Sequence, residues 1–198
     1  MSKVPSLVMN NGLEIPQVGF GVFLVPPEET KQAVAEALKA GYRLIDTAQG
    51  YRNEEGVGAA IAESDVPRDE LFITTKLTNS EHGYDKTLAA FDGSMEKLGI
   101  DVLDLFLIHW PLPMFDQYVE TWRAFEKLLA DGRVRSIGVS NFEIPPPGTA
   151  PRRDRREADG QSGRAASGVP AGGVARVPRR AWDPHGVVGP ARSGQRAA

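Results

Sequence analysis

Four side chains in the first part of the sequence have types and spacing suited to moving a proton. They are Asp46 in LIDTA, Tyr51 in AQGYRNEE, Lys76 at the end of FITTKL and His109 at the end of LFLIHWP. A tyrosine has an ordinary pKa of about 10 and is a sluggish acid unless a nearby cation lowers that pKa. We expect Lys76 to be this cation and Asp46 to pair with it and orient it. Reduction of a carbonyl needs such an acid for the developing alkoxide, and a polar group such as His109 on the carbonyl oxygen.

The elements that must position these side chains alternate along residues 1–143. Short apolar runs separated by amphipathic stretches are typical of a parallel sheet with helices outside it. Asn11-Gly12 predicts a β-hairpin at the N-terminus, because it is the strongest two-residue hairpin signal. The strands are expected at residues 18–23, 42–48, 70–77, 102–110 and 134–142, and the helices at residues 26–41, 53–64, 85–100 and 114–133.

The polar residues that interrupt the apolar strands all fall at the strands' C-terminal ends. They are Asp46, Lys76, His109, and Ser140 with Asn141. In a (β/α)8 TIM barrel that end is the active-site face. The predicted fold class is therefore α/β, the N-terminal portion of a (β/α)8 TIM barrel with a hairpin and about five strands. A doubly wound open sheet is the competing architecture, but GFGVF precedes Pro-Pro instead of the glycine-rich helix start that such a fold needs.

Several longer segments resemble the aldo-keto reductase family, and most closely its bacterial branch similar to 2,5-diketo-gluconate reductases. The matching segments are GFGVF, YRLIDTAQGYRNEEGVGAAI, LFITTKL, DLFLIHWP and RSIGVSNF, which together span nearly all of residues 1–143. Their order and spacing are highly specific.

The resemblance implies an enzyme that reduces a small-molecule aldehyde or ketone to an alcohol with NADPH. It implies that Tyr51 is the general acid, that Lys76 and Asp46 tune it, and that His109 orients the carbonyl. The positions implied at the nicotinamide end of the cofactor are Gly21, Val22, Asp46, Ser140 and Asn141. Phe23 and Trp110, together with His109, are expected to line an apolar substrate pocket.

Three local features carry separate expectations. The family usually has small residues before the tyrosine, as in TAAAY, whereas this chain has Gln49-Gly50. This change is expected to border the substrate pocket and to alter substrate choice. His82 in NSEHGYDK is expected to be an exposed loop histidine, and Asn53-Glu54-Glu55 is most simply the start of a helix, where acids favour the dipole.

Composition excludes several classes of protein and site. The chain has no cysteine and only three histidines in no close spacing, which argues against disulfides and against a metal cluster. No apolar run reaches the ~18 residues of a membrane span, and the N-terminus lacks the apolar core of a signal peptide. We therefore expect a cytoplasmic protein with no membrane partner, monomeric if the barrel were complete.

The net charge of −3 is divided unevenly along the chain. Residues 1–143 carry −9, which gives no electrostatic footprint for nucleic acid, whereas residues 144–198 carry +6. Arg, Ala, Gly and Pro make up 37 of the last 55 residues, and that region has no Leu, Phe, Tyr or Lys. Such a segment cannot bury enough apolar surface to offset its ordering entropy, so a disordered tail is expected at residues 144–198.

The tail is also consistent with translation in the wrong frame. Codons can be chosen for residues 177–195 so that the next frame reads FHAEHGIPTAWSARLGQ, which resembles a later segment of the same family. Residues 160–167 likewise permit VNQVELHP, a motif that follows the fifth strand in that family. Two matches in family order and at one shared offset lead to the hypothesis of a frameshift at or just after Glu143.

Three functions from different classes remain open at this stage. The first is the reductase, and the second is a non-catalytic member of the same fold that acts as a binding or structural protein. The third is a nucleic-acid binder that acts through the basic tail, which the hidden-frame match disfavours. A complete barrel takes about 250 residues, so we expect the chain as written to be unstable or to aggregate, to bind NADPH poorly and to have little or no activity.

Overall fold

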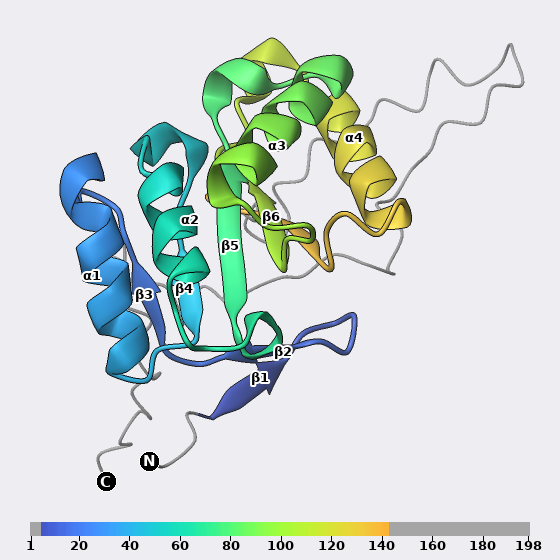
Figure 1. The fold of residues 1–198 in the computed structure, drawn as a ribbon. Helices are drawn as coiled ribbons and strands as arrows, with labels where there is room; N and C mark the ends of the chain where they lie inside the picture. The colour runs from blue at the N-terminus through green and yellow to red at the C-terminus, as the bar shows by residue number, and fades with distance from the viewer. Residues whose placement is uncertain (1–4, 143–198) are drawn as a thin grey trace, which may run out of the picture.

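The computed structural model describes residues 5–142 of the chain (Figure 1). The tail at residues 144–198 and the frameshift hypothesis lie outside the described residues. The described part begins with an antiparallel hairpin of β1 (Ser6–Val8) and β2 (Glu14–Pro16). Gly12 in its turn has a φ of 83°, a conformation that glycine adopts without steric cost. The predicted hairpin is therefore confirmed.

Five parallel strands form the central sheet, and their order in the sheet is their order along the chain. The strands are β3 (Gly19–Gly21), β4 (Leu44–Asp46), β5 (Phe72–Leu77), β6 (Leu105–Ile108) and β7 (Ile137–Val139). A doubly wound sheet would reverse its strand order partway across. The sequential order confirms the barrel type of topology and excludes the competing open sheet.

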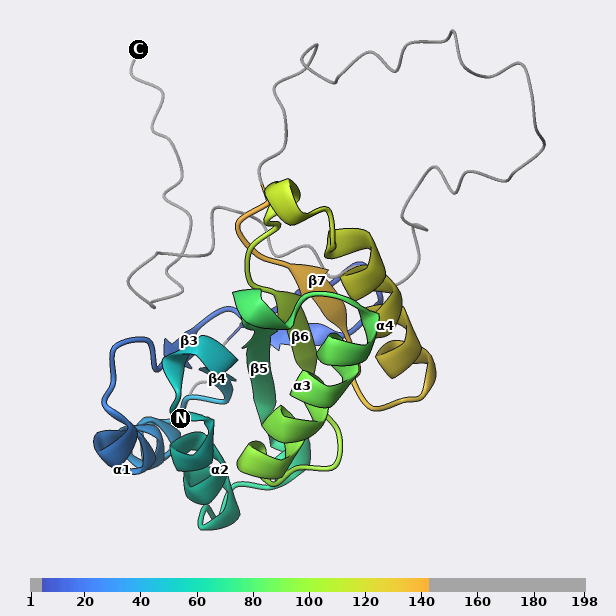
Figure 2. The same ribbon diagram turned by 90° about the horizontal axis from the view of Figure 1, so that it is seen from above.

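Four helices connect consecutive strands and lie on one side of the sheet (Figures 1 and 2). They are α1 (Pro27–Lys39), α2 (Glu54–Ala62), α3 (Tyr84–Leu98) and α4 (Tyr118–Ala130). Helix α1 has Pro27 and two acids in its first turn, which suits the helix dipole, and Gly41 with a φ of 99° follows its end. Among the described helices, none is both long and apolar enough to cross a membrane.

The prediction of one continuous helix over residues 114–133 was wrong at its start. A short 3₁₀ helix, Pro113–Phe115, comes first, and α4 begins only at Tyr118. Leu112 and Asp116 flank the short helix with φ values of 43° and 50°. These two residues in the left-handed conformation interrupt the helix. The residue types in this stretch do not signal that conformation, so the interruption was not predicted.

Two apolar clusters hold the sheet in place. The larger one fills the space between the strands and the helices and includes Ile45, Phe91, Phe106 and Phe125, with Phe106 and Phe125 stacked at 4.4 Å. The smaller cluster joins Met9 and Ile15 of the hairpin to four residues on the sheet: Leu44, Phe72, Leu105 and Leu107. The hairpin therefore covers the N-terminal ends of the strands and leaves the C-terminal ends to the loops.

A side chain in the hairpin turn fixes this cover to the far side of the sheet. The Asn11 amide donates hydrogen bonds to Ser136 Oγ at 2.6 Å and to the Arg135 carbonyl at 3.2 Å, just before β7. Among the described residues, β3 and β7 each pair on one side only, so these strands form the two edges of the sheet.

Candidate active site

The four residues singled out for proton chemistry meet at the C-terminal ends of β4, β5 and β6. Asp46 ends β4, Lys76 is the penultimate residue of β5, and His109 directly follows β6. Tyr51 ends the 3₁₀ helix η1 (Gln49–Tyr51) in the loop after β4. Parallel strands with aligned register bring these residues together, since Asp46 lies opposite Thr74 and Lys76 lies opposite Leu107.

Lys76 and Asp46 form a buried ion pair at the base of the site. The Lys76 ammonium donates to the two carboxylate oxygens of Asp46 at 2.6 and 2.8 Å and to the Thr47 carbonyl at 3.0 Å. The Lys76 side chain is 1% exposed and that of Asp46 is 18% exposed. A lysine so deeply buried must be held by partners, because an isolated ammonium would lose far too much hydration energy.

Tyr51 and His109 lie next to this ion pair. The Lys76 Nζ atom is 5.2 Å from the centre of the Tyr51 ring, and the Tyr51 and His109 rings meet edge to face at 5.9 Å. The ammonium, the phenol and the imidazole thus surround one small region at the C-terminal ends of the strands. The spatial convergence expected from the sequence is present in the structure.

The net direction of the Tyr51 pKa shift is opposite to the one expected from Lys76. Burial raises the pKa of Tyr51 far above its ordinary value, and the negative charge of Asp46 raises it further. Asp46 lies against the ammonium, so Lys76 does not act on the phenol as an isolated positive charge. Tyr51 is therefore protonated throughout the neutral range, which a proton donor must be before it acts.

The imidazole beside Tyr51 is neutral at the same pH. Burial, together with the nearby Lys76 charge, lowers the pKa of His109 to about 4. A neutral imidazole can donate one hydrogen bond through its N–H, but it does not act as an acid near pH 7. Of the two titratable groups at the mouth of the site, Tyr51 is the one that holds a transferable proton.

Exposed aromatic side chains border the site. The Phe23 ring lies 5.0 Å from the Tyr51 ring, and the Trp110 ring lies 6.4 Å from the His109 ring. Phe23 is 50% exposed and Trp110 is 47% exposed. These two residues therefore present apolar surface directly beside the phenol and the imidazole, where the sequence predicted a substrate pocket.

Among the residues predicted to hold a cofactor, Asn141, Ser140 and Gly21 have different surroundings from Val22. Asn141, in a left-handed conformation with a φ of 61°, donates to the His109 carbonyl at 2.8 Å and to Ser140 Oγ at 3.0 Å. Its amide oxygen accepts no hydrogen bond from residues 5–142. Gly21 pairs with Asp46 across the strands and keeps partly exposed surface.

Val22 has a different environment from its neighbour. Its side chain is fully buried in the larger apolar cluster, its N–H donates to the Asp46 carbonyl, and its carbonyl accepts from Asn53. This burial does not support a direct place for Val22 in a cofactor pocket, so that role stays a prediction.

The side-chain amides of Gln49 and Asn53 support the segment around Tyr51, a role that the sequence did not predict. Both polar atoms of the Gln49 side chain are engaged by α3 and by the residue after β5, so the amide is tied away from the substrate side. The expectation that Gln49 borders the substrate pocket is not supported by this orientation. Asn53 is 1% exposed and bonds to the loop after β3, beyond the simple helix start that was expected.

The expectation of an exposed loop position for His82 was wrong. His82 is 2% exposed, and burial lowers its pKa. Neither ring nitrogen has a hydrogen-bond partner among the described residues. The loop is drawn onto α4, where the Gly83 N–H donates to Thr121 Oγ1 at 2.8 Å. A tertiary contact of this kind has no local sequence signal.

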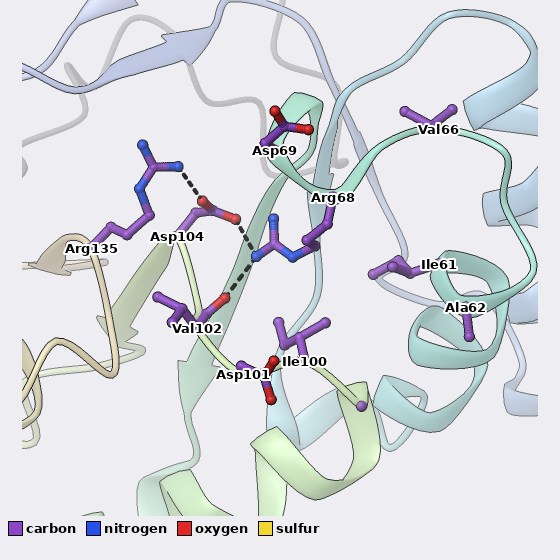
Figure 3. A pocket seen from close by; sticks show the side chains of 11 residues that line it. Ile61, Ala62, Val66, Arg68, Asp69, Ile100, Asp101, Val102, Asp104 and Arg135 are labelled. Carbon is purple, nitrogen blue, oxygen red and sulfur yellow. Dashed lines mark hydrogen bonds and ion pairs between the residues drawn. The ribbon is translucent and has the colours of Figure 1, made fainter.

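A separate pocket of about 670 Å³ lies at the opposite end of the strands (Figure 3). Three of its charged side chains pair with one another, because Asp104 accepts from Arg68 and from Arg135, each at 2.7 Å. Asp104 also accepts from the Ile73 N–H at 2.9 Å, and Arg68 donates to the Val102 carbonyl. The pocket is therefore lined by an ionic lock between strands and holds none of the predicted site residues.

Comparisons with known proteins agree with this architecture. Residues 18–146 match the model of the aldo/keto reductase family. An aldo-keto reductase of Mycolicibacterium smegmatis is 59% identical over 139 residues, which are 70% of this chain and 50% of the relative. The glyoxal reductase of Bacillus subtilis is 56% identical over 137 residues, which are 69% of this chain and 49% of the relative. The chain thus spans about half the length of the curated relatives it matches.

Solved structures show the same partial overlap. An aldo/keto reductase from Brucella melitensis is 58% identical with a TM-score of 0.69, and the match covers 71% of this chain and 55% of that one. A variant of Gox0644 crystallised with NADPH is 50% identical with a TM-score of 0.68, covering 72% of this chain and 51% of that one. Because the family model covers well over half of the sequence, this chain belongs to the aldo/keto reductase family.

Proposed function

We propose that residues 1–143 carry the proton-transfer half of an active site that reduces an aldehyde or ketone to an alcohol with NADPH. The observation that carries this proposal is the buried Lys76–Asp46 pair, which lies against a protonated Tyr51 and a neutral His109. Relatives named for reductase activity, and a neighbour crystallised with NADPH, support the same chemistry.

Tyr51 is proposed to donate its proton to the oxygen of the substrate. As the carbonyl is reduced, that oxygen becomes an alkoxide, the conjugate base of a group about as weakly acidic as water and far less acidic than a phenol. An alkoxide of that basicity takes a proton even from a phenol whose pKa is raised. The raised pKa of Tyr51 is therefore compatible with its role, and it keeps the proton in place until charge develops.

His109 and Lys76 have supporting roles in this proposal. The neutral imidazole of His109 can donate a hydrogen bond to the carbonyl oxygen and hold it beside the Tyr51 hydroxyl. Lys76 stabilises the negative charge that forms on Tyr51 when its proton leaves, and Asp46 keeps the ammonium in place. The exposed rings of Phe23 and Trp110 favour substrates with an apolar part.

NADPH supplies a hydride to the carbonyl carbon when bound. Asn141, Ser140 and Gly21 fit the nicotinamide end, because the Asn141 amide oxygen can accept a hydrogen bond from a carboxamide N–H. The choice of NADPH over NADH follows the neighbour that was crystallised with NADPH.

The expectations about residues 144–198, the cellular location and the oligomeric state remain proposals. We propose that residues 144–198 are an out-of-frame translation of the rest of the barrel's coding sequence, and sequencing of the gene tests this. A next frame that does not continue into VNQVELHP-like and FHAEHG-like text would end the hypothesis. A cytoplasmic location and a monomeric state for the completed barrel are likewise proposed, and fractionation and sedimentation test them.

The proposed function is tested best in a protein that has a whole barrel. A chimaera would join residues 1–143 to the second half of the Mycolicibacterium smegmatis relative, and NADPH oxidation would be followed with a panel of aldehydes and ketones. We expect carbonyl-dependent turnover from the chimaera and little or none from the 198-residue chain. NADPH binding by the chimaera without turnover of any carbonyl would favour the alternative, a non-catalytic binding protein of the same fold.

A further inference from the structure

Tyr51 is carried by a segment with little stability of its own. The 3₁₀ helix η1 is three residues long, and its backbone bonds are those from the Tyr51 N–H to the Ala48 carbonyl and from the Arg52 N–H to the Gln49 carbonyl. Arg52 follows with a φ of 59°, which is unfavourable for a residue with a side chain. The position of the phenol must therefore be imposed by contacts with the rest of the fold.

The Gln49 side chain makes the contacts that tie this segment to α3. Its Nε2 atom donates to the Ala90 carbonyl at 2.8 Å and to Ser94 Oγ at 2.9 Å. Its Oε1 atom accepts from the Thr78 N–H at 2.9 Å. Both α3 and β5 belong to the rigid core, since Phe91 and Leu77 are fully buried.

The second of these contacts bears on the ion pair. Thr78 comes two residues after Lys76 along the chain, and Gln49 comes two residues before Tyr51. One amide therefore links the segment that carries the phenol to the strand end that carries the ammonium. Across this link the Lys76 Nζ atom lies 5.2 Å from the centre of the Tyr51 ring.

We propose that Gln49 is a positioning residue that holds the Tyr51 phenol against the Lys76–Asp46 pair. The inference rests on the proposed function and concerns the same site. Asn53 secures the other side of the segment, through bonds to the carbonyls of Val22 and Val25, so the tyrosine is held between two amides. A family form with a small residue at position 49 lacks the Gln49 bonds, so this link distinguishes the present chain.

The ionisation of Tyr51 reports its position directly. The charged and titratable groups that face the phenol are Asp46, Lys76 and His109. If Gln49 is removed, the segment loosens, water reaches the phenol, and the charge of Asp46 is screened. Both changes lower the pKa of Tyr51 toward the ordinary value of about 10.

The test titrates Tyr51 in the completed-barrel chimaera by NMR with ring-labelled tyrosine, using Tyr51→Phe to assign the signal. We expect Tyr51 in the unchanged chimaera to ionise well above the ordinary value of about 10, and Gln49→Ala to bring its pKa within about one unit of that value. Thr87→Val is the matched control, because it removes one part-buried hydrogen bond at the start of α3 without touching Gln49.

The outcomes separate this inference from the proposed function. An unchanged Tyr51 pKa in Gln49→Ala, or an equal fall in Thr87→Val, would overturn the positioning role. If Gln49→Ala does not fold, Ser94→Ala removes a single acceptor, and a smaller fall in the same direction is expected; no fall would overturn the proposal. The titration needs no turnover, so an inactive chain leaves this test intact.

Discussion

The two ends of the parallel sheet each hold a buried ionic cluster, and the two clusters differ in what surrounds them. At the N-terminal end, Asp104 is 1% exposed and is saturated by Arg68, Arg135 and the Ile73 N–H. At the C-terminal end, the Lys76–Asp46 pair lies under a phenol and an imidazole that face the loops. The first cluster joins the segments that lead into β5, β6 and β7, whereas the second lies beside groups that can exchange a proton.

This contrast predicts that removing Lys76, unlike removing Asp104, strongly lowers turnover. Lys76→Met should lower turnover in the completed-barrel chimaera by about 10²–10³-fold, because the charge that stabilises the developing phenolate is lost. Steady-state NADPH oxidation measures the effect. Turnover within a few-fold of the unchanged chimaera would remove the distinction between the two clusters.

Removing Asp104 should lower stability and leave turnover almost unchanged. Asp104→Ala should lower the free energy of unfolding by about 2–4 kcal/mol, because two arginines and a buried N–H lose their acceptor. In the completed-barrel chimaera the substitution should leave kcat within about twofold of the unchanged value, since this cluster lies at the opposite end of the strands from Tyr51. Urea unfolding measures the stability, and Asp101→Ala is the control, an exposed acid in the same pocket expected to change it by no more than about 0.5 kcal/mol. Equal losses in the two variants would contradict the role given to Asp104.

The pH dependence of stability sharpens the comparison at the catalytic end. The pKa of His109 is lowered to about 4 from an unfolded value near 6.5. Between these two pH values, the unfolded chain binds a proton that the folded chain does not, so stability falls as pH decreases from about 6.5 to about 4. Melting temperatures across this range should fall less for His109→Asn than for the unchanged chain. Parallel curves for the two proteins would show that His109 is not the source of this dependence.

The smallest effect is expected at Arg52, beside the phenol. Its φ of 59° is one that glycine adopts at lower cost, so Arg52→Gly should raise the free energy of unfolding by up to about 1 kcal/mol. The added chain entropy of glycine in the unfolded state offsets part of the gain. Thermal unfolding of the variant measures the change, and a loss of stability would mean that Arg52 makes contacts that outweigh its backbone conformation.

The sequence predicted the large-scale features because they follow from local pattern. Apolar strands alternating with amphipathic helices were enough to predict a sequential parallel sheet, and polar residues at strand ends were enough to bring Asp46, Lys76 and His109 together. These features depend on periodicities of a few residues and on one rule about where parallel strands end.

The features that the sequence did not predict depend on partners far along the chain. Gln49 bonds to residues about forty positions away, and His82 is buried because its loop meets α4. The direction of the Tyr51 pKa shift depends on the balance of burial and neighbouring charge, and here both burial and Asp46 raise the pKa. That balance is set by distances in three dimensions, so residue types alone pointed to the wrong sign.

The central claim is that Tyr51 donates the proton during carbonyl reduction. The most direct test measures carbonyl-dependent NADPH oxidation by the completed-barrel chimaera with and without Tyr51→Phe, which keeps the ring and removes only the hydroxyl. The account predicts a fall of about 10²–10⁴-fold in kcat with an unchanged unfolding midpoint. A Tyr51→Phe protein that retains turnover within a few-fold would contradict it.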